Sequence, residues 1–345
     1  MHVQCQPRNN RLRETFHNGF CLTHDSFLEL AIDMMNNELF VCWMNKNCAG
    51  ADPSNLKLLL LGVLRCFGRV RTFDGTEEAT AISREVNGKF FHSFLTYGKP
   101  VLCRRHVIDV AHLIDGSKNE KLFAAAGVNC FMGSIDATHV GMIFCSNWAT
   151  HNYLGPKLIV PSRTCNATIA HWLQMMGSTC GHPATWNDET MNLHDDLVRG
   201  VKDGVVFEDN EFTLLEHDAN ENTIDAMHKG ARFMVDNGCL SWSCAVAPIE
   251  DDGSCEHIKF SEWLESMRKV VERTFGITKG RFFILRNGFR FHSIEKCDEA
   301  WLTCCVLNNR LLFVDRLHEN WDIGKLSTYE KECNKRNQRA MSFAL

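Results

Sequence analysis

The spacing of apolar residues changes once along the chain. Between about residue 22 and residue 120 they recur every third or fourth position, in segments such as FLELAIDMM, LKLLLLGVLRCF and REVNGKFFHSFL, and this period predicts helices. From about residue 127 the pattern is short, β-branched and alternating. NCFMGSIDATHVGMIFC predicts one strand, and KLIVPSRTCNATIAHWLQMMG predicts two more around the turn residues Pro161 and Ser162. Three consecutive strands favour an antiparallel meander, so a helical region precedes a sheet.

The helical region contains a candidate DNA-binding motif in the segment TFDGTEEATAIS. Asp74 and Glu77 predict a helix N-cap pair, EEATAI predicts a short helix, and Ser83 predicts the cap of the next helix. The resulting order is helix, short helix, turn, helix. As a helix-turn-helix it would offer three side chains of its last helix to a DNA groove: Arg84, Asn87 and Lys89. A plain helical bundle is the alternative, and periodicity alone favours it.

One strand and two helices are predicted beyond residue 230. The apolar strand ARFMVD ends on Asp236, and Asn237-Gly238 follows as a turn signal. FSEWLESMRKVVERTFG predicts an amphipathic helix, and CDEAWLTCCVLNNRLLF predicts a second, apolar helix. The apolar face of the first comprises Phe260, Trp263, Leu264, Met267, Val270 and Val271.

Charge is distributed unevenly along the chain. The 345 residues carry a formal net charge of −5, which taken alone argues against a protein that coats a polyanion. Residues 187–225, however, hold 12 acidic against 2 basic side chains, and we expect most of these acids to lie on a solvated face or loop. Residues 259–296 hold 9 basic against 4 acidic side chains. Local cations are therefore available for a nucleic-acid backbone.

The seventeen cysteines do not indicate a disulfide framework. Their number is odd, no CxxC pair occurs among them, and the opening residues MHVQCQPRNNRLRETFHNGF lack an apolar signal core. We therefore expect reduced thiols and no structural zinc site. The longest uncharged apolar stretch, LLLLGVL, is too short to span a bilayer, so we expect no membrane association.

Three acids stand out by their position. Asp136 lies within an apolar alternation, Asp236 ends an apolar strand, and Glu272 lies at the edge of the apolar helix face. A buried carboxylate needs a partner or a metal, and converging carboxylates form the oxygen-only site that suits Mg²⁺ or Mn²⁺ in two-metal phosphodiester chemistry. Each acid alone could equally be a strand-end cap or an ion-pair partner. Glu272 has Arg268 one helical turn earlier.

The sequence around these acids resembles a known family. The acids lie in GSIDATHVGM, ARFMVDNGCLSW and SMRKVVERTFGITKGRF, and WNDETMNL and WLTCCVLNNRLL complete the order of blocks. Order and spacing resemble the transposases of the PIF/Harbinger superfamily, and within it the "plant transposon protein" group of DDE endonucleases, over about residues 10–320. The helix-turn-helix section is also similar to a segment of these proteins, which favours that interpretation over a plain bundle.

The resemblance implies an α/β fold, a ribonuclease H-like mixed sheet of five strands flanked by helices. Asp136 would lie on the opening strand, Asp236 after the fourth strand and Glu272 on a following helix, 100 and then 36 residues apart. These three would be the catalytic acids and would hold two Mg²⁺ or Mn²⁺ ions. Asp188, in GHPATWNDET, matches another frequently acidic position of the family, and we expect a supporting role for it.

Basic residues near Glu272 become candidates for phosphate contacts: Arg268, Lys269, Arg273, Lys279 and Arg281. The sequence also departs from the family in two places. After the second aspartate it has Asn-Gly-Cys-Leu-Ser instead of a glycine-aromatic or Ile-Tyr-Pro sequence, and Asn308-Asn309 replaces a His-Asn pair. Neither change removes a predicted metal ligand, but both touch the neighbourhood of the site.

Four parts are predicted along the chain: a helical lead-in at 1–50, the helix-turn-helix-like segment at 51–120, the nuclease domain at 127–325 and a polar tail at 326–345 that we expect to be frayed. By resemblance, the function is that of a nuclear transposase. It would cleave double-stranded DNA at transposon ends and join the 3′ hydroxyl to a target site, with a Myb-like accessory protein or a second copy as partner. The alternatives are a catalytically idle, DNA-binding or scaffold descendant and a nuclease for RNA or hybrids.

Overall fold

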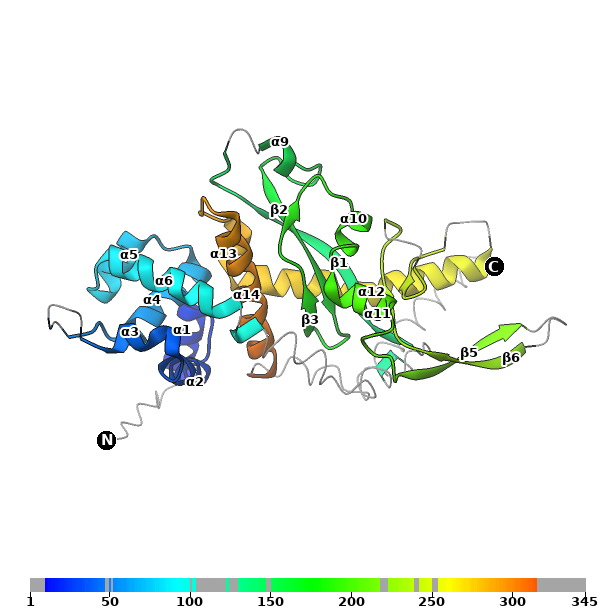
Figure 1. Cartoon of the computed structure of the whole chain (residues 1–345), viewed down its shortest axis with the longest axis horizontal. Helices are drawn as coiled ribbons and strands as arrows, with labels where there is room; N and C mark the ends of the chain where they lie inside the picture. Colours follow the sequence, from blue (N-terminus) through cyan, green and yellow to red (C-terminus); the bar gives the residue numbers. More distant parts are fainter. Residues whose placement is uncertain are drawn as a thin grey trace.

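Helices form the N-terminal part of the molecule, and a mixed sheet with helices forms the rest (Figure 1). The computed structural model describes residues 10–46, 50, 52–99, 101–103, 122–123, 130–146, 150–217, 223–238, 242–249 and 254–314. The predicted boundary between residues 120 and 127 lies outside the described residues except for Leu122 and Phe123, and the predicted tail at 326–345 lies wholly outside them.

The N-terminal part consists of short helices, as the periodicity predicts. They are α1 (Asn10–Phe20), α2 (His24–Met35), the 3-10 helix η1 (Glu38–Phe40), α3 (Val41–Met44), α4 (Leu56–Arg69), α5 (Phe73–Thr80) and α6 (Arg84–Tyr97). The predicted order of helix, short helix, turn and helix is present in α4, α5 and α6. A plain bundle can share this order, so the arrangement alone does not establish a DNA-binding motif.

Capping side chains set the starts of α5 and α6. Ser83 caps α6 as predicted, since its side chain accepts a hydrogen bond from a first-turn amide. The predicted cap of α5 is wrong. Thr72 is the N-cap, because its hydroxyl lies just before the helix and reaches a free amide, whereas Asp74 is already inside the first turn. Asp74 instead pairs with the guanidinium of Arg84, and Glu77 accepts a hydrogen bond from the Arg84 amide.

A mixed sheet forms the centre of the second part. Its strands are β1 (Phe131–Gly141), β2 (Ser162–Ile169), β3 (Met175–Ser178), β4 (His182–Pro183), β7 (Arg232–Met234) and β8 (Ala245–Val246). The order is β3-β2-β1-β7-β8, and β4 pairs with β2. The first three strands are antiparallel, as the meander prediction requires, and β7 and β8 run parallel to β1. This mixed α/β arrangement is consistent with the DDE nuclease fold that the resemblance implies.

One predicted strand and its turn are wrong. Residues 157–160, before Pro161, form turns and bends, and the meander reverses at residues 170–174 instead. The apolar side chains before Pro161 have no sheet face to cover, and Ile159 is 97% exposed. The apolar run of three residues at 158–160 therefore does not form a strand without a partner.

The acidic stretch is more ordered than a loop. Its last third contributes to a hairpin of two antiparallel strands, β5 (Glu211–His217) and β6 (Thr223–Lys229), which projects away from the sheet (Figure 1). Phe212 is buried at its base, and Arg232 lies over the Phe212 ring. The expectation of a solvated face or loop holds for most of the acids, since Asp196, Asp203, Glu208, Asp209 and Glu211 are exposed, but it is wrong for Asp195, which is buried and accepts a hydrogen bond from the Asn166 side chain.

Helices of the second part accompany the sheet. They are α9 (Thr150–Tyr153), α10 (Asp188–Asn192), α11 (Asp196–Lys202), α12 (Cys255–Arg281), α13 (Phe283–Asn287) and α14 (Ile294–Val314). The two predicted long helices are thus confirmed as α12 and α14. On α12, the centre of the predicted apolar face is buried: Leu264, Met267, Val270 and Val271. No helix in the described part of the chain is long and apolar enough to cross a membrane.

A buried apolar cluster joins the N-terminal helices to the second part. It runs from α4 and α6 through α13 and α14 to β1 and β2. The ring centroids of Phe67 on α4 and Phe282 are 6.4 Å apart, and those of Phe91 on α6 and Phe291 are 5.9 Å apart. The helices are therefore packed against the second part across a shared apolar core.

Two polar contacts fix α14 to the sheet. Arg163 on β2 and Asp298 on α14 form a buried bidentate ion pair, and Asp298 also accepts a hydrogen bond from the Gly181 amide. Asn309, the second residue of the Asn308-Asn309 pair and the one that matches the family's asparagine, bonds through its amide group to both backbone groups of Met175. Asn309 therefore has a structural role at the edge of β3.

Candidate metal centre

Asp136 is held in the middle of β1 by two hydrogen bonds. Its Oδ1 accepts from the Ala137 amide at 2.7 Å, and its Oδ2 accepts from Nη1 of Arg268 at 2.9 Å. The side chain is only 16% exposed, and burial raises the pKa of Asp136 although both donors oppose that shift. The nearby charge of Asp236 raises the pKa further. The carboxylate is therefore costly to keep charged without added cations.

Asp236 lies beside Asp136 because the strands before the two acids are parallel neighbours. Ser134 on β1 pairs with Met234 on β7, and each acid comes two residues later. Asp236 is therefore at the same level as Asp136, in the segment that directly follows the neighbouring strand β7. Its Oδ1 accepts a hydrogen bond from the Gly238 amide at 3.1 Å, which fixes the turn after β7. The structure thus brings the first two predicted acids together.

Asp188 joins these two acids from the start of α10. A Cβ atom added to Gly238 would lie 3.3 Å from Oδ2 of Asp188 and 3.4 Å from Oδ1 of Asp236, so the two carboxylates face the same glycine. Burial raises the pKa of Asp188, and the charges of Asp236 and Asp136 add to that increase. Asp188 is therefore part of the acid cluster, in the place where the sequence analysis expects a supporting acid.

Glu272 is connected to the cluster through Arg268. Both lie on α12, and Nη2 of Arg268 is 3.7 Å from Oε1 of Glu272 and 3.2 Å from Oε2 of Glu265. Glu272 is 55% exposed. The guanidinium of Arg268 thus bridges the first and third predicted acids. Glu265 was missed by sequence reasoning, although its spacing of three residues from Arg268 is a signal for a helix ion pair.

The other four basic candidates on α12 fall into two groups. Lys279 donates to the backbone carbonyl of His139 at 2.8 Å, and Arg281 donates to the side-chain oxygen of Asn308 at 2.7 Å. Both therefore brace α12 against neighbouring elements. Lys269 and Arg273 are exposed on α12. Of these four candidates, Lys269 and Arg273 offer the solvated surface that a phosphate contact needs.

The three candidates on α6 differ in accessibility. Asn87 is buried, and its amide donates to the backbone carbonyls of Ile82 and Ser83, so it is not available to a DNA groove. Arg84 and Lys89 are exposed, but each pairs with an acid, Asp74 at 3.2 Å and Glu85 at 2.7 Å. The predicted DNA-reading face of α6 is therefore not assembled as the sequence suggests.

The oxygen ligands that the cluster offers are of the type that a hard divalent cation prefers. Asp136, Asp188 and Asp236 supply only carboxylate oxygens, and their mutual repulsion favours an added positive charge. Nε of Arg268 is buried without a hydrogen-bond partner, so this guanidinium is incompletely satisfied where it stands. Across the described residues, no three His, Cys, Asp or Glu side chains lie close enough together to hold a metal ion. Metal binding would therefore require Arg268 and the carboxylates to rearrange.

We expect Asp188→Asn to stabilise the metal-free protein. A carboxyl whose pKa is raised by burial binds its proton more readily in the folded state, so stability falls as pH rises from the ordinary aspartate pKa through the raised one. Asparagine removes this cost, and we expect the melting temperature at pH 7 in a chelator to rise by roughly 2 °C. The exposed Asp203→Asn variant is the control. A lower melting temperature for Asp188→Asn would show that the charged Asp188 carboxylate does not destabilise the metal-free protein.

Comparison with known proteins gives one match. The family model described as DDE superfamily endonuclease matches residues 136–309, a span that begins at Asp136 and contains Asp188, Asp236 and Glu272. No curated protein matches the chain, and no solved structure matches it.

Proposed function

The chain belongs to the DDE superfamily endonuclease family, and on this basis we propose that it is a metal-dependent DNA endonuclease and transposase of the Harbinger type. Its substrate would be double-stranded DNA at transposon ends, and its place of action the nucleus. The observation that carries the proposal is the convergence of Asp136 and Asp236 at the same level of two parallel strands, with Asp188 facing them. Such a concentration of partly buried carboxylates is costly unless cations are bound there.

The acids would have distinct roles in this reaction. Asp136 and Asp236 would be the main ligands of two Mg²⁺ or Mn²⁺ ions, Glu272 would complete the second set of ligands, and Asp188 would support the site. When bound, the ions would activate the attacking oxygen and stabilise the leaving one, first with water and then with the freed 3′ hydroxyl as nucleophile. Before they bind, Arg268 orients the Asp136 carboxylate through the hydrogen bond from its Nη1, and its charge opposes the rise in the pKa of Asp136 that burial causes.

The proposal is tested with the purified full chain and DNA that carries the ends of its element. We expect nicks at the ends in the presence of Mg²⁺ or Mn²⁺ and none after EDTA treatment, because carboxylates alone cannot activate water for phosphodiester attack. An RNA–DNA hybrid of the same sequence is the substrate control. Equal cleavage in EDTA, or faster cleavage of the hybrid, would contradict the proposal.

One observation favours a second function, that of a catalytically idle DNA-binding protein. Arg268 already neutralises Asp136, and it also pairs with Glu265 and approaches Glu272. A protein that retains this arrangement in the presence of Mg²⁺ would bind DNA without cutting it. The melting temperature separates the two functions, since a chain that binds the ions must be stabilised by millimolar Mg²⁺.

A further inference from the structure

An open cleft lies between α1 and α4, at the end of the molecule remote from the hairpin. Its volume is about 480 Å³, and its lining is short: Thr15, Asn18, Gly19, Arg65, Arg69 and Arg71. Three of these side chains are cationic, and none is acidic or apolar. This composition is that of an anion-binding surface, because guanidinium groups bind phosphate oxygens in pairs.

Two of the three arginines are held in place by contacts within the chain. The guanidinium of Arg65 lies 5.0 Å from the centre of the Phe20 ring, and that of Arg69 lies 5.6 Å from the centre of the Phe283 ring. Arg69 also donates a hydrogen bond to the backbone carbonyl of Asn18. These contacts orient the groups, so little side-chain entropy remains to be lost on binding, and none of them involves a carboxylate.

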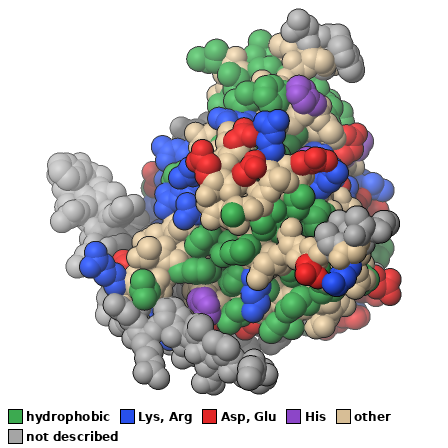
Figure 2. Space-filling model, turned by 90° about the vertical axis from the view of Figure 1, so that its left-hand side faces the viewer, with side chains coloured by type: hydrophobic (Ala, Val, Ile, Leu, Met, Phe, Trp, Pro, Cys, Tyr) green, Lys and Arg blue, Asp and Glu red, His purple; other side chains and the backbone are tan. Residues whose placement is uncertain are grey.

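Arg71 extends the positive surface toward the second part of the molecule. It also lines a neighbouring pocket of about 360 Å³ between helices α4–α6 and α13, together with Arg84, Arg290 and the acidic Asp74, which pairs with Arg84. The arginines of the cleft have no carboxylate partner among the described residues, in contrast to Arg84 and Lys89. Figure 2, which looks onto this end of the molecule, shows basic side chains gathered at the left of the view and alternating with acidic ones higher up.

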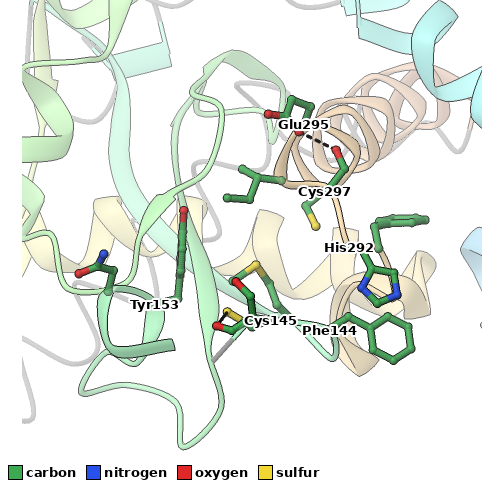
Figure 3. Close-up of a pocket in the computed structure, with 12 residues that line it drawn as sticks. Phe144, Cys145, Tyr153, His292, Glu295 and Cys297 are labelled. Carbon is green, nitrogen blue, oxygen red and sulfur yellow. Dashed lines mark hydrogen bonds between the residues drawn. The ribbon is translucent and has the colours of Figure 1, made fainter. Parts of the chain in front are cut away.

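The pocket in Figure 3 provides a contrast. It measures about 290 Å³ and is lined by aromatic and thiol side chains, among them Phe144, His292, Cys145 and Cys297, with the carboxylate of Glu295 at its rim. It contains no lysine or arginine, so a phosphate group has no cation to meet there. An arginine-rich lining is therefore shared by the cleft and the neighbouring pocket that Arg71 also lines, whereas the pocket of Figure 3 lacks it.

We propose that the cleft formed by Arg65, Arg69 and Arg71 binds the phosphate backbone of duplex DNA. It would take over the role that the sequence assigned to the exposed face of α6. The inference rests on the proposed function, which supplies DNA as the substrate. Two or three consecutive phosphates of one strand match three guanidinium groups in one open cleft, and contacts of this kind position DNA without reading its sequence.

The test is DNA binding by the full chain, measured by fluorescence anisotropy with a labelled 30-bp duplex over a range of salt concentrations. We expect the triple variant Arg65→Gln/Arg69→Gln/Arg71→Gln to bind roughly 10- to 100-fold more weakly at moderate salt. The slope of log affinity against log salt should fall by about 3, close to 0.9 for each lost phosphate contact. Lys46→Gln/Lys57→Gln, which removes two exposed charges from the same part of the chain, is the matched control and should keep the affinity within about 2-fold.

Two further variants keep the test decisive. If the triple variant does not fold, as judged by circular dichroism, Arg71→Gln alone should reduce the slope by about 1, because this exposed side chain has no aromatic ring against its guanidinium among the described residues. Unchanged affinity and slope in the cleft variants would overturn the inference. So would a loss of binding in Arg84→Gln/Lys89→Gln that the cleft variants do not show.

Binding and cleavage report separately on the two proposals. If the cleft variants bind DNA like the parent while Mg²⁺-dependent nicking persists, the cleft is not the DNA site and the proposed function stands. If the cleft variants lose binding in a chain that never cuts DNA, the cleft inference holds and the nuclease proposal fails. Stabilisation by inorganic phosphate that the triple variant loses, with DNA binding intact, would assign the cleft to free phosphate and overturn the DNA assignment.

Discussion

Replacing Asp136 by asparagine should abolish metal-dependent nicking while DNA binding persists. Asparagine keeps the size of the side chain but removes the charge that a divalent cation needs. Mutation of a residue that merely supports a metal ligand typically lowers metal affinity or activity by 10- to 100-fold. Loss of a ligand itself should therefore lower the nicking rate by on the order of 10³-fold or more. The measurement is the initial rate of nicking under single-turnover conditions. A variant that cuts within about 10-fold of the parent would show that Asp136 is not a ligand.

The chain offers a matched pair of glutamates for the same assay. Glu265 and Glu272 both approach Arg268 from α12, at 3.2 Å and 3.7 Å, but only Glu272 is a predicted ligand. We expect Glu272→Gln to lose nicking nearly as completely as the Asp136 variant, whereas Glu265→Gln should remain within a few fold of the parent. Equal losses would mean that both act by positioning Arg268, and they would contradict the assignment of Glu272 as the third acid.

Removing Asp298 should have the largest effect on stability. Its two carboxylate oxygens lie 2.9 Å from Nη2 of Arg163, and both side chains are almost fully buried. Asp298→Ala leaves the Arg163 charge buried without its partner, a change that typically costs about 3–5 kcal/mol. We expect the melting temperature to fall by roughly 10 °C, measured by thermal unfolding.

An exposed ion pair provides the control for this stability test. Asp196 lies 3.8 Å from Arg199 on the surface of α11 and is fully exposed. Asp196→Ala should leave the melting temperature within the experimental error, since a pair of this kind contributes little. If the two alanine variants were destabilised equally, the ion pair between β2 and α14 would not be a fixed point of the fold.

Periodicity predicts much of the fold from the sequence. The long amphipathic runs became α4, α6, α12 and α14, and the alternating run became β1, because each pattern buries one continuous face. Short signals were less reliable. Asp74 is a good capping residue in the wrong place, since a threonine two positions earlier was available, and the apolar residues before Pro161 form no strand because no neighbouring strand pairs with them.

The acids were identifiable because a charged residue in an apolar pattern must be explained by a partner. Their convergence could not be derived in the same way, since it depends on β1 and β7 being parallel neighbours across 100 residues of sequence. The role of Arg268 was equally hidden. A sequence shows that it can pair with Glu272 one turn later, but only the packing of α12 on β1 places its guanidinium against Asp136. Asn87 was misjudged because its burial depends on the turn before α6.

The apolar core shared by the N-terminal helices and the sheet also fixes the distance between the arginine cleft and the carboxylates. Because α4 and α6 pack against α13 and α14 in one apolar core, with Phe67 and Phe91 against the rings of Phe282 and Phe291 on either side of α13, the arginine cleft cannot swing toward or away from the carboxylates as a tethered module would. A duplex held in the cleft would then meet the acids at one fixed number of base pairs along its length. The packing of the core would therefore determine the distance along the DNA between the bound segment and the cut.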